Sequence, residues 1–159
     1  MARWLFLLCG MCLMLSCSQS NTNTATPADL KVVIGEGGGF TGLWHGFTVE
    51  PGGVVQRWRG PIPEGDPEPA GELSAEDLGK LWTAIEGQGF FSMPEGESGN
   101  LTRFLQVTAR GQTRRVQWVP QPKEAERRAK PAILFSQCQE VLQVLEETKA
   151  KAPRMRKSQ

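Results

Sequence analysis

Alternating apolar and polar positions divide the first third of the chain into short strands. Residues 30–34 are rich in β-branched side chains and predict a strand, which the glycine run at 35–39 is expected to end. Residues 40–49 and 54–59 predict two more strands, joined by the turn signal Pro51-Gly52-Gly53. These two strands are expected to form a β-hairpin.

The pattern then predicts a loop, a helix and a second hairpin. Residues 60–72 carry four prolines among acidic residues and are expected to form a loop. Ser74 marks the start of the helix, because its hydroxyl can cap the first turn together with Asp77 three residues on. Residues 101–109 and 113–119 predict the second hairpin. The helix that begins at Ser74 has one apolar face, formed by Leu78, Leu81, Trp82 and Ile85.

A final helix is predicted to begin near Pro131, a residue that suits the first helical turn. The predicted order of elements is β-β-β-α-β-β-α. Short hairpins combined with two amphipathic helices indicate an α+β fold, in which an antiparallel sheet of about five strands carries both helices on one face. The apolar stripe of the final helix contains Leu134, Cys138, Val141, Leu142 and Leu145.

The first seventeen residues have the layout of a secretory signal. Arg3 precedes an uncharged apolar run, and the small residue Ser16 stands before Cys17. The run is too short to cross a bilayer, which takes about 20 residues. The run is then either part of an ordinary cleaved signal or a buried apolar helix, unless the residues around Cys17 give it a more specific role. The sequence Met14-Leu15-Ser16-Cys17 resembles the lipobox of bacterial lipoproteins, with Met14 where that family has Leu.

The lipobox resemblance implies cleavage before Cys17, a diacylglycerol on its thiol and usually an acyl chain such as palmitate on its new amine. It also implies attachment to a membrane of the bacterial cell envelope, the outer membrane if the source is Gram-negative. Four segments are then expected. They are a signal peptide at 1–16, the lipidated cysteine with a disordered tether at 17–29, a single domain at 30–150 and a basic disordered tail at 151–159.

Composition limits the classes of function. The chain has 18 Lys and Arg against 17 Asp and Glu, and Arg3 lies in the signal, so the mature chain balances 17 against 17. This balance argues against nucleic acid as the main partner, because phosphate binding needs a basic excess or patch. Cys9 and Cys12 leave with the signal and Cys17 takes the lipid, so Cys138 has no partner for an intramolecular disulfide.

Few residues in the chain could carry chemistry. The glycine run at 35–39 lacks the spacing and the following helix of a nucleotide-binding loop. His45 is the only histidine and is expected to be an ordinary strand residue, and Cys138 is expected to be a buried thiol. The acids at 64–68 could hold a weak calcium ion, but solvated loop acids are the better interpretation. The sequence predicts no catalytic residue, cofactor, resident metal or small-molecule substrate.

Apolar residues occupy both parities of two predicted strands. Because the helices cover one face of the sheet, aromatic residues on the other face either bind a partner or are covered by the tether, the long loop or the tail. An envelope protein is the expected partner, since aromatic side chains offer contact area but few converging polar groups. The candidate binding face contains Phe40, Trp44 and Phe104 beside the glycines Gly37, Gly38 and Gly39.

The segment Gly37-Gly38-Gly39-Phe40-Thr41-Gly42 is similar to the start of a strand in two groups of proteins. Small bacterial lipoproteins of unassigned function share a GGFTG-type start, a helix, a hairpin and a closing helix. The emfourin family of inhibitors of thermolysin-like metalloproteases shares a comparable start and order of elements. These resemblances imply a membrane-anchored, non-catalytic binding module or, alternatively, a protease inhibitor. An enzyme of unknown class is the third interpretation.

Overall fold

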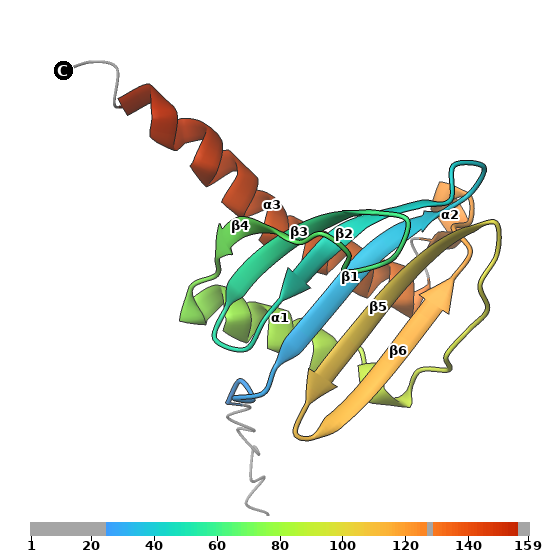
Figure 1. The fold of residues 1–159 in the computed structure, drawn as a ribbon. Helices are drawn as coiled ribbons and strands as arrows, with labels where there is room; N and C mark the ends of the chain where they lie inside the picture. The colour runs from blue at the N-terminus through green and yellow to red at the C-terminus, as the bar shows by residue number, and fades with distance from the viewer. Residues whose placement is uncertain (1–24, 127–128, 156–159) are drawn as a thin grey trace, which may run out of the picture.

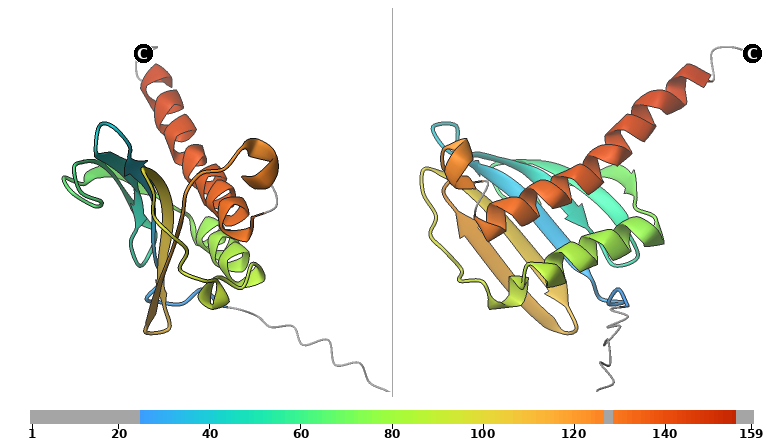
Figure 2. Two further views of the ribbon diagram at one scale, coloured as in Figure 1. Left: turned by 90° about the vertical axis from the view of Figure 1, so that its right-hand side faces the viewer. Right: turned by 180° about the vertical axis from the view of Figure 1, so that it is seen from behind.

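The computed structural model describes residues 25–126 and 129–155 and has an α+β architecture. Six antiparallel strands form one sheet in the order β4-β3-β2-β1-β5-β6 (Figure 1). Two helices, α1 (Ala75–Gly87) and α3 (Lys130–Met155), lie on one face of this sheet (Figure 2). A short helix α2 (Lys123–Glu126) and a 3₁₀ turn η1 (Phe90–Ser92) lie in the connections. The strands are β1 (Lys31–Gly38), β2 (Leu43–Val49), β3 (Val54–Gly60), β4 (Glu68–Glu72), β5 (Leu101–Ala109) and β6 (Gln112–Trp118).

Both predicted hairpins and both predicted helices are confirmed. β2 pairs with β3, and β5 pairs with β6 around a turn at Arg110 and Gly111, which have φ values of 53° and 72°. The predicted cap of α1 is present, because the hydroxyl of Ser74 accepts a hydrogen bond from the backbone N–H of Asp77 at 3.1 Å.

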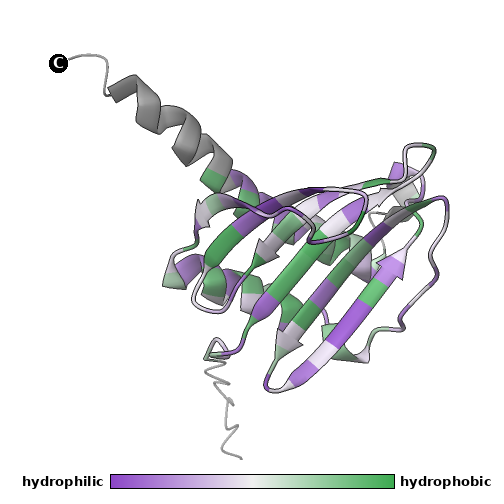
Figure 3. Ribbon diagram, in the orientation of Figure 1, coloured by the Kyte–Doolittle hydropathy of each residue, from purple (hydrophilic) through white to green (hydrophobic). Residues whose placement is uncertain are grey.

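The main core lies between the helices and the sheet. The predicted apolar face of α1 is buried there, and so are Leu134 and Cys138 of α3, both with 0 % exposed surface. Ile34 and Leu105 face each other across β1 and β5 and belong to the same core. In Figure 3 the central strand β1 is mostly apolar, whereas the edge strand β6 is mostly hydrophilic. Neighbouring residues of a strand point to opposite faces of the sheet, and in β1 residues of both parities are buried.

The glycine run was predicted to end the first strand at residue 34, and this is wrong, because β1 continues to Gly38. Gly35 pairs with Gly46 of β2, and the indole ring of Trp58 lies over both residues. A Cβ atom on either glycine would overlap this ring. Glycine usually weakens a strand, because it has no side chain that could pack. Here the indole ring of Trp58 from β3 packs on the two glycines instead.

The proline-rich segment was expected to be a loop throughout, and this is wrong for its last five residues. They form β4, an edge strand that pairs with β3 and places Glu68 opposite Arg57. An edge strand tolerates proline, because one side of it needs no N–H donor, and Pro69 lies next to a register shift. The sheet therefore has six strands instead of about five.

The two ends of the described chain extend the domain beyond its expected limits. The signal peptide, Cys17 and most of the expected tether lie in residues 1–24, outside the described residues. Asp29, at the end of the tether segment, accepts hydrogen bonds from the backbone of the β5–β6 turn. α3 continues to Met155, past the expected end of the domain at residue 150, and includes Pro153. Lys and Ala at residues 149–152 favour helix, whereas Pro153 does not. No helix in the described part of the chain is long and apolar enough to cross a membrane.

Candidate functional site

The face of the sheet opposite the helices carries a second, smaller core. It consists of Val33, Trp58 and Phe104, each 1 % exposed, with Trp44 packed against its edge. The ring of Phe104 makes an edge contact with Trp44, at 5.9 Å between ring centroids, and a stacked contact with Trp58 at 6.2 Å. We call these four residues the aromatic cluster and this side of the sheet the second face.

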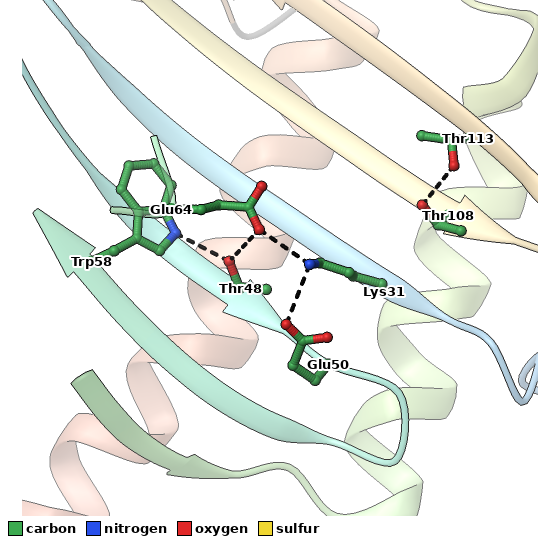
Figure 4. A network of polar contacts seen from close by, with 7 residues as sticks. All are labelled: Lys31, Thr48, Glu50, Trp58, Glu64, Thr108 and Thr113. Atoms are coloured by element: carbon green, nitrogen blue, oxygen red, sulfur yellow. Dashed lines mark hydrogen bonds and ion pairs between the residues drawn. The ribbon is translucent and has the colours of Figure 1, made fainter. Parts of the chain in front are cut away.

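The loop of residues 61–67 lies over the second face. In Figure 1 it leaves the end of β3 and passes in front of β2 and β1, on the side away from the helices. Glu64 joins it to the sheet, because its Oε2 atom lies 3.2 Å from Lys31 Nζ and 3.4 Å from Thr48 Oγ1 (Figure 4). The hydroxyl of Thr48 also accepts a hydrogen bond from Trp58 Nε1 at 3.1 Å. A single carboxylate thus links the loop to the aromatic cluster.

This arrangement corrects the predicted binding face. Phe104 does not reach solvent, because the rings of Trp44 and Trp58 pack beside it and the guanidinium carbon of Arg115 lies 3.8 Å from its ring centroid. Trp44 is half-buried and lies against Gly37, where a Cβ atom would overlap it. Of the three predicted aromatic residues only Phe40 is fully exposed, at 106 %. The prediction that all three form one contiguous exposed patch is therefore wrong.

Phe40 stands at the tip of the β1–β2 hairpin. The turn is closed by a hydrogen bond of 3.3 Å from the backbone N–H of Gly42 to the carbonyl of Gly39. Gly39 also donates a hydrogen bond to the carbonyl of Asn100, which ties the turn to the start of β5. Gly39 and Gly42 have φ values of 65° and 63°, a region in which side chains other than glycine are strained. Two of the predicted site residues, Gly39 and Phe40, thus lie in one anchored turn, and Gly37 and Gly38 lie in β1 just before it.

Two leucines extend the apolar surface below this turn. Leu43 of β2 and Leu101 of β5 both face Gly38 of β1, so that the three residues form one row across the end of the sheet. The leucines are 41 % and 44 % exposed. We call Phe40, Leu43 and Leu101 the apolar end of the domain.

The next row on the helix side of the sheet is polar. His45 Nε2 lies 3.2 Å from Glu36 Oε1, and the other oxygen of Glu36 lies 2.7 Å from Arg103 Nε. The side chain of His45 is 60 % exposed and lines an open groove of about 690 Å³ with, among others, Arg59 and Asp66. The histidine therefore lies in a strand beside Trp44, in contact with a carboxylate.

Cys138 is the buried core thiol that the sequence predicts. It has no exposed surface, and burial raises the pKa of its thiol to about 12. The thiol thus stays protonated at neutral pH, a state in which it is not a nucleophile.

The acids of the loop are not gathered around a common point. Glu64 contacts Lys31, and Glu68 lies 3.2 Å from Arg57 Nη2. Within residues 25–126 and 129–155 no group of three or more His, Cys, Asp or Glu side chains lies close enough to hold a metal ion.

Comparison of the chain with protein-family models and with curated proteins finds no match.

Proposed function

We propose that this chain is a bacterial lipoprotein whose α+β domain acts as a non-catalytic binding module in the cell envelope. The domain contacts a protein partner through its apolar end. The observation that carries this proposal is Phe40, which is fully exposed at the tip of an anchored turn.

An exposed phenylalanine on an anchored turn suits protein recognition. Its ring offers a large apolar area, and a preformed turn loses little conformational entropy on binding. Leu43 and Leu101 enlarge this area with partly exposed apolar side chains. The polar pair of His45 and Glu36 borders the leucines, as charged and polar groups border the apolar centre of many interfaces.

The apolar end is also well placed for a domain tethered at its N-terminus. β1 starts beside the tether segment and ends at the apolar end, and its eight residues span about 26 Å. A lipid on Cys17 would bring the membrane to the first end of this strand, and two or more acyl chains give stable anchoring. The apolar end then lies at the opposite end of β1 from the attachment point, where a partner can reach it.

Site-specific photo-crosslinking in envelopes of the source bacterium tests this proposal. A photoreactive phenylalanine analogue at position 40 is expected to give one defined protein adduct. The same analogue at position 62, where Ile62 is 63 % exposed in the loop of the second face, is the matched control and is expected to give none. Equal products from both positions, or none from position 40, would contradict the binding role. An unmodified Cys17 thiol in the intact mass of the native protein would contradict the lipoprotein assignment.

A second candidate function is inhibition of a metalloprotease, as the emfourin resemblance implies. The anchored, protruding turn that carries Phe40 favours it, because a rigid exposed loop suits insertion into a protease cleft. The mature chain should then inhibit thermolysin cleaving a peptide substrate, and Phe40→Ala should weaken this inhibition at least tenfold. Absence of inhibition by the wild-type chain would exclude this candidate for thermolysin.

A further inference from the structure

The second face suggests a ligand site that is distinct from the apolar end. The loop of residues 61–67 covers it, yet the largest apolar side chain of this loop, Ile62, is 63 % exposed and does not pack on the aromatic cluster. The contact between loop and sheet is made by the Glu64 carboxylate, which reaches Lys31 and Thr48. The loop is therefore held over an apolar cluster by a polar group.

The closed loop also has an unfavourable backbone. Glu64 and Asp66 have φ values of 59° and 46°, in the left-handed region that costs energy for a residue with a side chain. The contacts of Glu64 offset this cost in the closed form. A competitor for these contacts would therefore release the loop as well as its carboxylate.

The negative charge of Glu64 acts on two cations of the second face, Lys31 and Arg115. Partial burial opposes the charge of Lys31, but hydrogen bonds and charges of Glu64 and Glu50 outweigh it and raise the pKa of Lys31. Burial lowers the pKa of Arg115, and the charge of Glu64 acts in the opposite direction. Arg115 lies over the ring of Phe104, and Lys31 Nζ lies 3.3 Å from Glu50 Oε1 in addition to its contact with Glu64. Withdrawing Glu64 would therefore leave two cations, Lys31 and Arg115, against the remaining carboxylate of Glu50.

We propose that residues 61–67 form a displaceable lid, and that Glu64 occupies the place of the carboxylate of a free ligand with one apolar chain. The carboxylate of this ligand takes over the contacts with Lys31 and Thr48. Its chain takes the place of the loop over Trp58, beside the guanidinium of Arg115. The charge of the uncovered face favours an anion, and Lys31 and Thr48 already hold a carboxylate in this position.

The test uses monomeric decanoate as the probe and the ¹⁹F signal of 5-fluorotryptophan at position 58 as the readout. In Glu64→Ala, decanoate should shift this signal and bind at least tenfold more tightly than in the wild type. Glu68→Ala is the matched control, because Glu68 of β4 pairs with Arg57 of β3 and lies in no ion pair with Lys31 in the described part of the chain. It should leave the affinity for decanoate unchanged. Decylamine, with the same chain and the opposite charge, should bind at least tenfold more weakly than decanoate.

Three results would overturn the proposal. They are no effect of decanoate on Trp58 in Glu64→Ala, an equal gain in Glu68→Ala, and equal binding of decylamine. If circular dichroism shows that Glu64→Ala is unfolded, Glu64→Gln replaces it, because Gln keeps the size of the side chain and one acceptor oxygen. The expected gain is the same, and its absence has the same meaning. This test does not involve Phe40, so its outcome is independent of the proposed protein partner.

Discussion

The carboxylate of Asp29 lies 2.8 Å from the backbone nitrogen of Arg110, a residue 81 positions later in the chain. Its second oxygen accepts a hydrogen bond of 2.7 Å from Gly111. These bonds fasten the segment before β1 to the β5–β6 turn. The bond from Gly111 and then that from Arg110 lower the pKa of Asp29, because both stabilise the charged carboxylate.

Asp29→Asn should therefore change how stability depends on pH. A carboxyl whose pKa is lower in the folded state stabilises the fold above its unfolded pKa, and this contribution is lost as the pH falls through the folded value. The variant should be less stable than the wild type at pH 7, and the difference should shrink below about pH 4. Urea unfolding at pH 7 and pH 3 measures both. Asp66→Asn, in the exposed loop after β3, is the control, because it removes one carboxylate and leaves the two hydrogen bonds of Asp29 in place.

Ser74→Ala should lower the free energy of unfolding by about 1 kcal/mol. The hydroxyl of Ser74 accepts a hydrogen bond from the N–H of Asp77, a first-turn group that has no partner within the helix. Urea titration at neutral pH gives the change. Ser136→Ala, at an exposed position inside α3, should stay within about 0.5 kcal/mol of the wild type. Equal effects of the two substitutions would mean that the cap contributes nothing.

Cys138 should resist alkylation in the native protein. Its thiol is fully buried and its pKa is about 12, so that almost no thiolate is present at pH 7 to 8. Treatment with iodoacetamide followed by peptide mapping should find the label at Cys138 only after denaturant is added. Rapid labelling of the folded chain would place this thiol at the surface.

The elements that the sequence predicts are those with local signals. Ser74 lies three residues before Asp77, and Cys138 lies four residues after Leu134, so cap and stripe are visible within a single helix. The extension of β1 has no such signal. It depends on Gly46 and Trp58, which come from two other strands, and so the run of glycines alone points to a break.

The candidate site was predictable only in part for the same reason. Phe40 follows directly from the glycine-rich turn, and its exposure is a local property. The burial of Phe104 depends on Trp44, Trp58 and Arg115, which come from three other strands, and the two tryptophans are distant from it in sequence. One signal for the second face was present in the sequence, since Trp58 has the opposite parity to the core residue Val55.

Phe104→Ala and Phe40→Ala should separate the core from the exposed surface. Phe104 is 1 % exposed and packs on two tryptophans, so its truncation should cost about 3 to 5 kcal/mol of stability. Phe40 is fully exposed, and its truncation should change stability by less than about 0.5 kcal/mol. Guanidinium unfolding monitored by far-UV circular dichroism compares them. Similar losses in both variants would contradict the burial described for the second face.

Gly46→Ala should destabilise the domain through Trp58. A Cβ atom at Gly46 would overlap both the indole ring and the carbonyl oxygen of Ile34. The carbonyl belongs to the paired backbone of β1, so it can move only if the strand shifts. The overlap with Trp58 in turn requires the indole ring to move. Inserting a methyl group into a well-packed site of this kind costs about 3 kcal/mol.

Gly60→Ala is the matched control for this substitution, because Gly60 lies in β3 and nothing lies within 4 Å of its Cβ position. Alanine in such a position reduces the freedom of the unfolded chain and should leave the stability unchanged or raise it by up to about 1 kcal/mol. The two variants differ from the wild type by one methyl group each, so a difference in their unfolding free energies reports on the close contacts of Gly46 with Trp58 and with the carbonyl of Ile34. Equal stability of Gly46→Ala and Gly60→Ala would show that the ring does not lie on the paired glycines, and β1 would then need another reason to continue through them.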